Sequence, residues 1–235
     1  MAPGPPGRRP VLALRPWETL DRASPGAGAA ELVLRRRGET YMISLGGVVL
    51  MSSQGHASED ALCLHGLAGA PSGARVLVGG LGLGFTLRAV LDRVGPAGRV
   101  TVSELSPAVL RWNRERFPHL SAGAVDDPRV TVCLGDVGAL LGREGEPYDA
   151  VLLDVDNGPV ALSSPSNVAL YSAEGLRKVR RSLAPKGALA LWSAGPDPGF
   201  EARLAREGFR VEAHRVATRP RSSGGAVVLV GRRGG

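Results

Sequence analysis

The sequence predicts an α/β fold with a seven-stranded, mostly parallel, doubly wound (Rossmann-like) sheet whose last strand is antiparallel, preceded by a small N-terminal antiparallel β-sheet. Three observations indicate this fold. From Arg75 onward, aliphatic runs that suit buried parallel strands alternate with helical patterns. The first of these runs breaks into a glycine-rich turn. The last two runs, 209–216 and 226–230, are joined by a loop too short for a crossover helix, so we expect them to pair antiparallel.

Before Arg75 the chain has two expected parts. Residues 1–10 are rich in proline and glycine and are expected to be disordered. Residues 11–57 are expected to form the small N-terminal sheet from three alternating runs, 31–35, 40–45 and 48–51. The remainder, 58–235, is expected to be a nucleotide-binding domain that begins with a helix over 58–67, for which Ser58 is the expected N-cap.

The elements of the second domain follow in a regular order. Pro107 suits the first turn of a helix, and the Pro185-Lys186-Gly187 run is expected to close the helix before it. The expected strands before the closing pair are 75–78, 99–103, 129–134, 150–153 and 188–192. The expected helices are 85–93, 107–117, 136–141, 172–183 and 198–207.

A glycine-rich turn follows the first strand of this domain. Its four glycines are Gly79, Gly80, Gly82 and Gly84. Glycine permits positive φ and lets backbone N–H groups approach a ligand closely, and the helix that follows adds the positive end of its dipole. A dinucleotide fingerprint would need a further glycine where Leu87 stands, so the spacing is typical of S-adenosylmethionine-type cofactors. A tight turn without a ligand is the alternative.

Three strands are followed by an acid at their carboxyl ends. Glu104 ends the second strand, Asp136 follows the third and Asp154 the fourth. The carboxylate of Glu104 can accept hydrogen bonds from both hydroxyls of a ribose. Because the carboxyl ends of parallel strands meet at one edge of a sheet, we expect these acids and the glycine turn to share a site. For any single acid the alternative is a helix cap or a solvated loop.

Composition narrows the classes of function. The apolar runs are far shorter than the ~20 residues that span a bilayer, and the run 11–14 is too short for a signal peptide, so a cytoplasmic location without membrane contact is expected. Cys63 and Cys133 fit no metal spacing, and no metal is expected. The net charge of +7 is nearly all arginine, and aromatic residues make up only 4%, so a nucleic-acid partner is not favoured.

The motifs together resemble one known family. In chain order they are the glycine turn, Glu104, Gly135-Asp136, the run 148–154, the run 170–174 and the run 183–187. Their order and spacing resemble the spermidine synthase (polyamine aminopropyltransferase) family over about residues 31 to 200, with this chain as a divergent short member. The resemblance implies a transferase of polyamine biosynthesis on the S-adenosylmethionine-dependent methyltransferase fold. It also implies that Glu104 binds the ribose, Asp136 the adenine amino group, and Asp154 acts as the catalytic acid.

The departures from the family fall on the amine-binding positions. The aspartate that holds the amine of the aminopropyl donor is replaced by Gly82. The second acid of the family's Asp-x-x-Asp pair is replaced by Asn157, unless Asp156 takes its place. The family's Tyr-His or Tyr-Gln pair is best matched by Glu59-Asp60. Four residues are therefore candidates for binding the acceptor: Asp156, Glu59, Asp60 and Tyr171.

The chemistry of such a transfer gives Asp154 two tasks. A nucleophile attacks a carbon next to a sulfonium, so the protein mostly positions the reactants and removes a proton from an ammonium acceptor. A carboxylate attracts the cationic amine and can accept its proton. The alternative is that Asp154 only caps the turn at Asn157-Gly158-Pro159.

Three functions are compatible with these residues. The first is transfer of an alkyl (aminopropyl) group from decarboxylated S-adenosylmethionine to a small-molecule amine. The second is methyl transfer from S-adenosylmethionine itself, which Gly82 favours and Val78 disfavours, because many methyltransferases carry an acid at that second position. The third is a non-catalytic nucleotide-binding or dimer-forming relative, which the retained acids disfavour. A homodimer is a further hypothesis, and the sequence does not name the acceptor.

Overall fold

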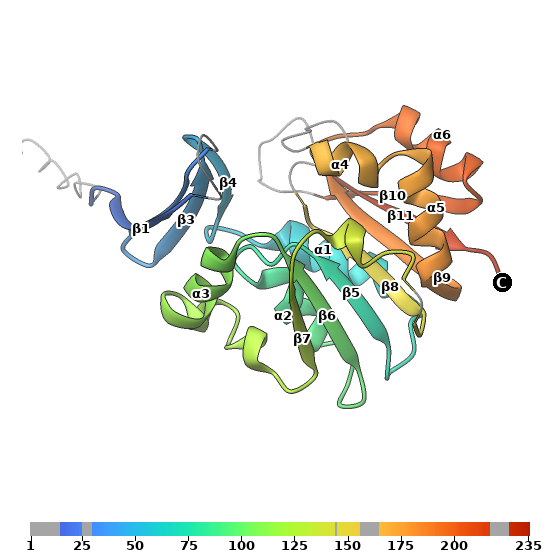
Figure 1. Cartoon of the computed structure of the whole chain (residues 1–235), viewed down its shortest axis with the longest axis horizontal. Coiled ribbons are helices and arrows are strands. Elements are labelled where there is room, and N and C mark those ends of the chain that lie inside the picture. The colour runs from blue at the N-terminus through green and yellow to red at the C-terminus, as the bar shows by residue number, and fades with distance from the viewer. Residues whose placement is uncertain (1–14, 25–29, 144, 156–164, 217–225) are drawn as a thin grey trace, which may run out of the picture. The chain divides into compact units, whose positions relative to one another are not determined.

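The computed structural model of the chain describes residues 15–24, 30–143, 145–155, 165–216 and 226–235 (Figure 1). The expected disordered segment 1–10 lies outside these residues. The chain divides into two compact units, Met1–Ser52 and Ser53–Gly235. The first unit contains the smaller sheet and the second the larger one, while the domain bounds 11–57 and 58–235 stay a prediction.

The first unit is an antiparallel sheet with four strands rather than the three that the sequence predicted. In spatial order they are β1 (Glu18–Ala23), β2 (Leu32–Arg37), β3 (Thr40–Leu45) and β4 (Val48–Ser52). The core of this sheet includes Leu34 and Ile43, which pair across β2 and β3. β1 was missed because it buries no side chain fully and shows no apolar alternation. It is held partly by an ion pair between Glu18 and Arg36 at 3.0 Å.

The second unit holds the seven-stranded sheet that the sequence predicted. Its strands are β5 (Arg75–Gly79), β6 (Arg99–Glu104), β7 (Val130–Leu134), β8 (Tyr148–Leu153), β9 (Leu183–Ser193), β10 (Phe209–Val216) and β11 (Ala226–Arg233). Their spatial order is β10-β11-β9-β8-β5-β6-β7. Only β11 runs antiparallel to its neighbours, pairing with β9 and β10. The order reverses between β5 and β8, where a ligand crevice is expected.

The helices of the second unit are α1 (Ala57–Gly66), α2 (Phe85–Leu91), α3 (Pro107–Glu115), α4 (Pro165–Leu170), α5 (Ala173–Ser182) and α6 (Pro198–Arg206). Pro107 occupies the first turn of α3, as expected. The N-cap of α1 is His56 and not Ser58, whose hydroxyl instead donates to Glu59 at 2.5 Å. The expected helix over 136–141 is a short 3-10 turn, and the Pro185-Lys186-Gly187 run lies inside β9.

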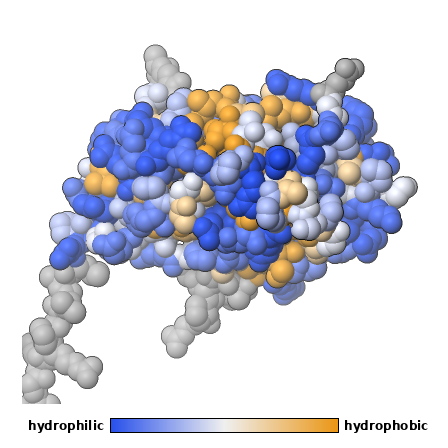
Figure 2. Space-filling view, turned by 90° about the horizontal axis from the view of Figure 1, so that it is seen from below, coloured by the Kyte–Doolittle hydropathy of each residue, from blue (hydrophilic) through white to orange (hydrophobic). Residues whose placement is uncertain are grey.

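Helices pack on both faces of the larger sheet. Gly66 seats α1 on the sheet so closely that an added Cβ would contact the side chain of Leu152 and lie 2.9 Å from that of Ala190. The alternate residue Leu153 faces the opposite side, in a core with Leu176 of α5 and Phe200 of α6. Figure 2 shows a mainly hydrophilic face with apolar residues gathered in patches. No helix in the described part of the chain is long and apolar enough to cross a membrane.

Candidate active site

The glycine turn is tied to the strands on either side of β5. The backbone N–H of Gly80 donates to Ser103 of β6 at 2.8 Å, and that of Asp154 donates to Gly79 at 2.9 Å. Gly80 has φ of +89°, and a Cβ at this position would lie 2.5 Å from the carbonyl oxygen of Asp154. Only glycine fits such a close backbone crossing. The turn is therefore packed directly against the end of β8 and hydrogen-bonded to it.

Asn113 of α3 holds the second half of the turn. Its Nδ2 donates to the carbonyl of Gly82 at 2.8 Å, and its side chain is fully buried. Gly84 is the N-cap of α2, and a Cβ there would lie 2.8 Å from Oδ1 of Asn113 and from Cβ of Ser121. Sequence reasoning missed Asn113, although an amide on the buried face of an otherwise amphipathic helix was a signal that could have identified it.

Glu104 lies at the end of β6 against the same turn. One carboxylate oxygen accepts from the N–H of Leu81 at 3.0 Å and the other from that of Ser106 at 2.8 Å. Burial raises the pKa of Glu104 above its ordinary value, and the backbone hydrogen bonds, that of Ser106 first, oppose the rise. The backbone N–H groups of Gly82 and Leu105 also stabilise the ionised carboxylate. The ribose assignment stays a prediction that this geometry accommodates.

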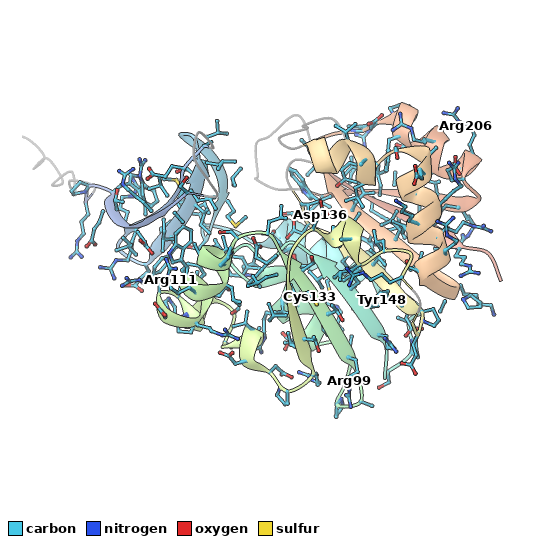
Figure 3. The ribbon with its side chains drawn as sticks, viewed as in Figure 1. Arg99, Arg111, Cys133, Asp136, Tyr148 and Arg206 are labelled. Carbon is cyan, nitrogen blue, oxygen red and sulfur yellow. The ribbon has the colours of Figure 1, made fainter. Side chains whose placement is uncertain are left out.

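Asp136 follows β7 at the same edge of the sheet. Figure 3 shows it at the end of the sheet opposite to Arg99, where β6 begins. One of its oxygens accepts from Gly138 N–H at 2.7 Å and so caps the 3-10 turn over 137–139. The cap leaves the second carboxylate oxygen for another donor, and the assignment to an adenine amino group stays a prediction.

Two exposed leucines stand beside these acids. Leu105 directly follows Glu104 and is 63% exposed, and Leu134 ends β7 and is 54% exposed. The N–H of Gly135 donates to the carbonyl of Glu104 at 2.8 Å, which joins the two strand ends. Large apolar side chains left in solvent beside strand-end acids suit the flat face of a base. The sequence could not predict their exposure, because the pattern does not distinguish an exposed leucine at a strand end from a buried strand leucine.

Asp154 sits at the end of β8 beside α2. Thr86, which is only 1% exposed, donates its hydroxyl to Oδ2 of Asp154 at 2.7 Å. The pKa of Asp154 is raised to about 6, by burial first and then by the negative charge of Glu59, while the hydrogen bond from Thr86 opposes the rise. A carboxyl of this kind is ionised at neutral pH yet basic enough to accept a proton. The Thr86 contact was not predicted.

The two acids of α1 have different surroundings. Glu59 lies near enough to Asp154 to affect its pKa. Asp60 instead lies 2.7 Å from Nδ1 of His56, whose ring stacks on Phe85 of α2 with 5.0 Å between centroids. The charge of Glu59 thus acts on the candidate catalytic acid, whereas Asp60 is paired with a histidine.

The remaining candidates are placed less directly. Asp156 and Asn157 lie outside the described residues. Tyr171 is 3% exposed in the core and meets the ring of Phe200 edge-on at 5.5 Å. Its assignment to the acceptor, like that of Asp156, Glu59 and Asp60, stays a prediction. Within the described residues, no group of three or more His, Cys, Asp or Glu side chains is placed to hold a metal ion.

Comparisons with known proteins agree on one family. Residues 56–197, more than half of the chain, match the spermine/spermidine synthase domain. Polyamine aminopropyltransferase 1 of Streptomyces coelicolor is 38% identical over 125 residues, which are 52% of this chain and 23% of that protein. Putrescine N-methyltransferase 2 of Nicotiana tabacum is 29% identical over 148 residues, 62% of this chain and 40% of that protein. The matches thus span less than half the length of either relative.

A solved structure shares the fold. A spermidine synthase crystallised with the transition-state analogue AdoDATO superposes with a TM-score of 0.73, covering 92% of this chain and 74% of that one at 17% identity. At such low identity the match shows the fold alone. It includes both the small sheet and the seven-stranded sheet that the sequence predicted, since it extends over nearly the whole chain.

Proposed function

We propose, on the premise that this chain belongs to the spermine/spermidine synthase family, that it transfers an alkyl group, in the first place aminopropyl, from a sulfonium nucleoside to a small-molecule amine. The family uses decarboxylated S-adenosylmethionine and acts on amine acceptors. The observation that carries the proposal is the Asp154 carboxyl, whose pKa of about 6 and place beside the glycine turn suit a general base.

The donor side supports nucleotide binding through backbone and carboxylate groups. The glycines Gly79, Gly80, Gly82 and Gly84 form the turn against which the nucleoside would lie. Glu104 would accept from the ribose hydroxyls, and Asp136 from the adenine amino group. Leu105 and Leu134 would offer apolar surface to the base. These roles match the strand-end positions of Glu104 and Asp136 and the carboxylate oxygen of Asp136 that does not cap the 3-10 turn.

The reaction then requires one proton acceptor at the other side of the crevice. An amine must be neutral to attack the carbon next to the sulfonium. Its lone pair forms the new C–N bond as the C–S bond breaks, and the sulfur leaves as a neutral thioether. The proton lost by the acceptor passes to Asp154, whose negative charge, with that of Glu59, also attracts the cationic amine. Asp60, Asp156 and Tyr171 are proposed as further contacts to the acceptor.

Methyl transfer from S-adenosylmethionine is a second candidate on the same site. Gly82 removes the acid that would hold the amine of an aminopropyl donor. One of the relatives is named a putrescine N-methyltransferase, so the matched region occurs in a protein with that activity as well. Asp154 would serve as the base in either reaction.

Calorimetric titration with the two donors separates the candidates. We expect the aminopropyltransferase to bind decarboxylated S-adenosylmethionine, and a methyltransferase to bind S-adenosylmethionine. The variant Gly82→Asp should tighten the decarboxylated donor by about tenfold through one charge-assisted hydrogen bond, because aspartate tolerates the φ of +53° found at this position. Tighter binding of S-adenosylmethionine alone would contradict aminopropyl transfer. Binding of neither donor would contradict both candidates.

A further inference from the structure

The C-terminal hairpin, formed by β10 and β11, contacts the C-terminal end of α1. Arg232 of β11 donates from one guanidinium nitrogen to the carbonyl of Ala68 at 2.9 Å and from the other to that of His65 at 3.1 Å. The carbonyl of His65 is in the last turn of α1 and also accepts from the backbone N–H of Ala68 at 3.4 Å, and Ala68 directly follows Leu67, the C-cap of the helix. A guanidinium there satisfies them and faces the negative end of the helix dipole.

A contact between two imidazole rings also joins the hairpin to α1. The imidazoles of His65 on α1 and His214 on β10 stack with 3.8 Å between centroids and 8° between planes. Glu212 bridges the two contacts, because one oxygen lies 3.6 Å from Nε2 of His214 and the other 3.5 Å from Nε of Arg232. The charged and titratable side chains around the contact are His65 of α1, Arg210, Glu212 and His214 of β10, and Arg232 of β11.

The near end of α1 reaches the candidate active site. The ring of His56, the N-cap of α1, stacks on Phe85 at 5.0 Å, and the next residue, Thr86, donates to Asp154 at 2.7 Å, so the start of α1 lies close to Asp154. Glu59 is in the first turn of this helix, and its charge contributes to the raised pKa of Asp154. The helix of 10 residues is about 15 Å long. Gly66 lets the backbone of the helix come close to the side chains of Leu152 on β8 and Ala190 on β9, where no larger residue would fit. A displacement at the hairpin end would therefore be transmitted along a rigid helix to Glu59.

We propose that Arg232 is a positioning residue which, by fixing the C-terminal end of α1, holds Glu59 beside Asp154. Its importance for catalysis rests on the proposed function, whereas the placement of Glu59 does not. Arg232, Glu212 and His214 all lie beyond residues 56–197, the part that matches the family domain, so the match does not include this contact. The hairpin would thus influence the acidity of the catalytic carboxyl from outside the matched region.

The test is an NMR titration of the Asp154 side-chain carboxyl in the full chain, with the resonance assigned by its loss in Asp154→Asn. The charge of Glu59 raises the pKa of Asp154, so Arg232→Met should lower the pKa by about half a unit or more as Glu59 moves away. Glu59→Gln should lower it in the same direction. The double variant should show no larger shift than Glu59→Gln alone, because both changes remove the same interaction.

Arg233→Met is the matched control. Arg233 is the next residue on β11 and donates to the carbonyl of Leu183 instead of to α1. It should destabilise the hairpin without shifting the Asp154 pKa. His214→Ala removes the ring stack and the contact of His214 with Glu212 but leaves the hydrogen bonds of Arg232 to the end of α1. It should give a smaller shift in the same direction, which keeps the proposal testable if Arg232→Met does not fold.

Two outcomes would overturn the proposal. One is an unchanged Asp154 pKa in the Arg232 or His214 variant when Glu59→Gln lowers it, and the other is an unchanged pKa in Glu59→Gln itself. The titration needs neither donor nor acceptor. A chain without transferase activity would therefore still report on the position of Glu59, and failure of the proposed function can be told from failure of this inference.

Discussion

The proposed donor side and the proposed acceptor side of the site are built in different ways. On the donor side, Glu104 and Asn113 bind backbone groups of the glycine turn, and Gly80 crosses the backbone of the neighbouring strand. On the acceptor side, Asp154 and Glu59 are two acids close together, with one hydroxyl, that of Thr86, as the described partner of Asp154. The first region is fixed by hydrogen bonds that the fold itself needs. The second keeps two acids near enough to repel each other, and the fold does not need this repulsion.

This difference has a consequence for stability. The pKa of Asp154 is raised from 3.8 to about 6 in the folded chain. A carboxyl with a raised pKa contributes stability that is fully present below the unfolded value and is lost as the pH rises through the folded value. Between these two values the folded protein becomes less stable with rising pH because of this group. On the acceptor side, the raised pKa that makes Asp154 a suitable base also lowers the stability of the folded protein. On the donor side, substitutions should lower both stability and nucleotide affinity.

Asp154→Asn should have the largest effect on the reaction. The amide keeps the size of the side chain but removes the charge and the proton acceptor, so transfer should slow by ~10²–10⁴-fold. Nucleotide affinity should change little. The free energy of unfolding at pH 7 should rise, by about 1–3 kcal/mol, because the buried charge is gone. Single-turnover transfer at saturating donor, denaturant unfolding and nucleotide titration measure the three quantities. A rate within about threefold of the parent would leave Asp154 as a turn cap only.

Gly80→Ala should break the donor side. Its Cβ would lie 2.5 Å from the carbonyl oxygen of Asp154 at a φ of +89°, so both a clash and backbone strain are expected. Together these should lower the free energy of unfolding by about 2–4 kcal/mol and weaken nucleotide binding.

Gly69→Ala is the control for that prediction. Gly69 has a similar φ of +82°, but a Cβ there would meet nothing within 4 Å. It should cost about 1 kcal/mol and leave nucleotide binding unchanged. Equal losses of stability in the two variants would show that the backbone crossing between β5 and β8 is unimportant.

The same difference explains what the sequence could predict. The seven strands, the glycine turn and the strand-end acids follow from local patterns, because aliphatic runs and glycines report directly on the backbone. The partners of those acids do not follow. Thr86 meets Asp154 from 68 residues away, and Asn113 reaches Gly82 across 31 residues. Such pairings depend on how α2 and α3 pack, which no local pattern encodes. Similarly, β1 was missed because it buries no side chain fully.

Thr86→Val gives the smallest expected effect and tests what sets the acidity of Asp154. The hydroxyl of Thr86 stabilises the ionised form of Asp154, and it is the one cause that lowers the pKa of this group. Valine has nearly the same shape but donates no hydrogen bond. The pKa of Asp154 should therefore rise above about 6, by about half to one unit. The transfer rate should fall several-fold at pH 6 and less at pH 8, where the carboxyl is ionised in both proteins.

The measurement is the pH dependence of single-turnover transfer, compared with that of Thr131→Val. Thr131 is an exposed residue on the edge strand β7, so its replacement removes a hydroxyl without affecting Asp154 and should leave the profile unchanged. A Thr86→Val profile that moves to lower pH, or a loss of rate that is equal at every pH, would mean that the hydroxyl does not act by stabilising the Asp154 carboxylate. In that case the pKa of Asp154 would depend on burial and Glu59 alone. The acceptor side would then owe nothing to hydrogen bonding, in still greater contrast to the donor side.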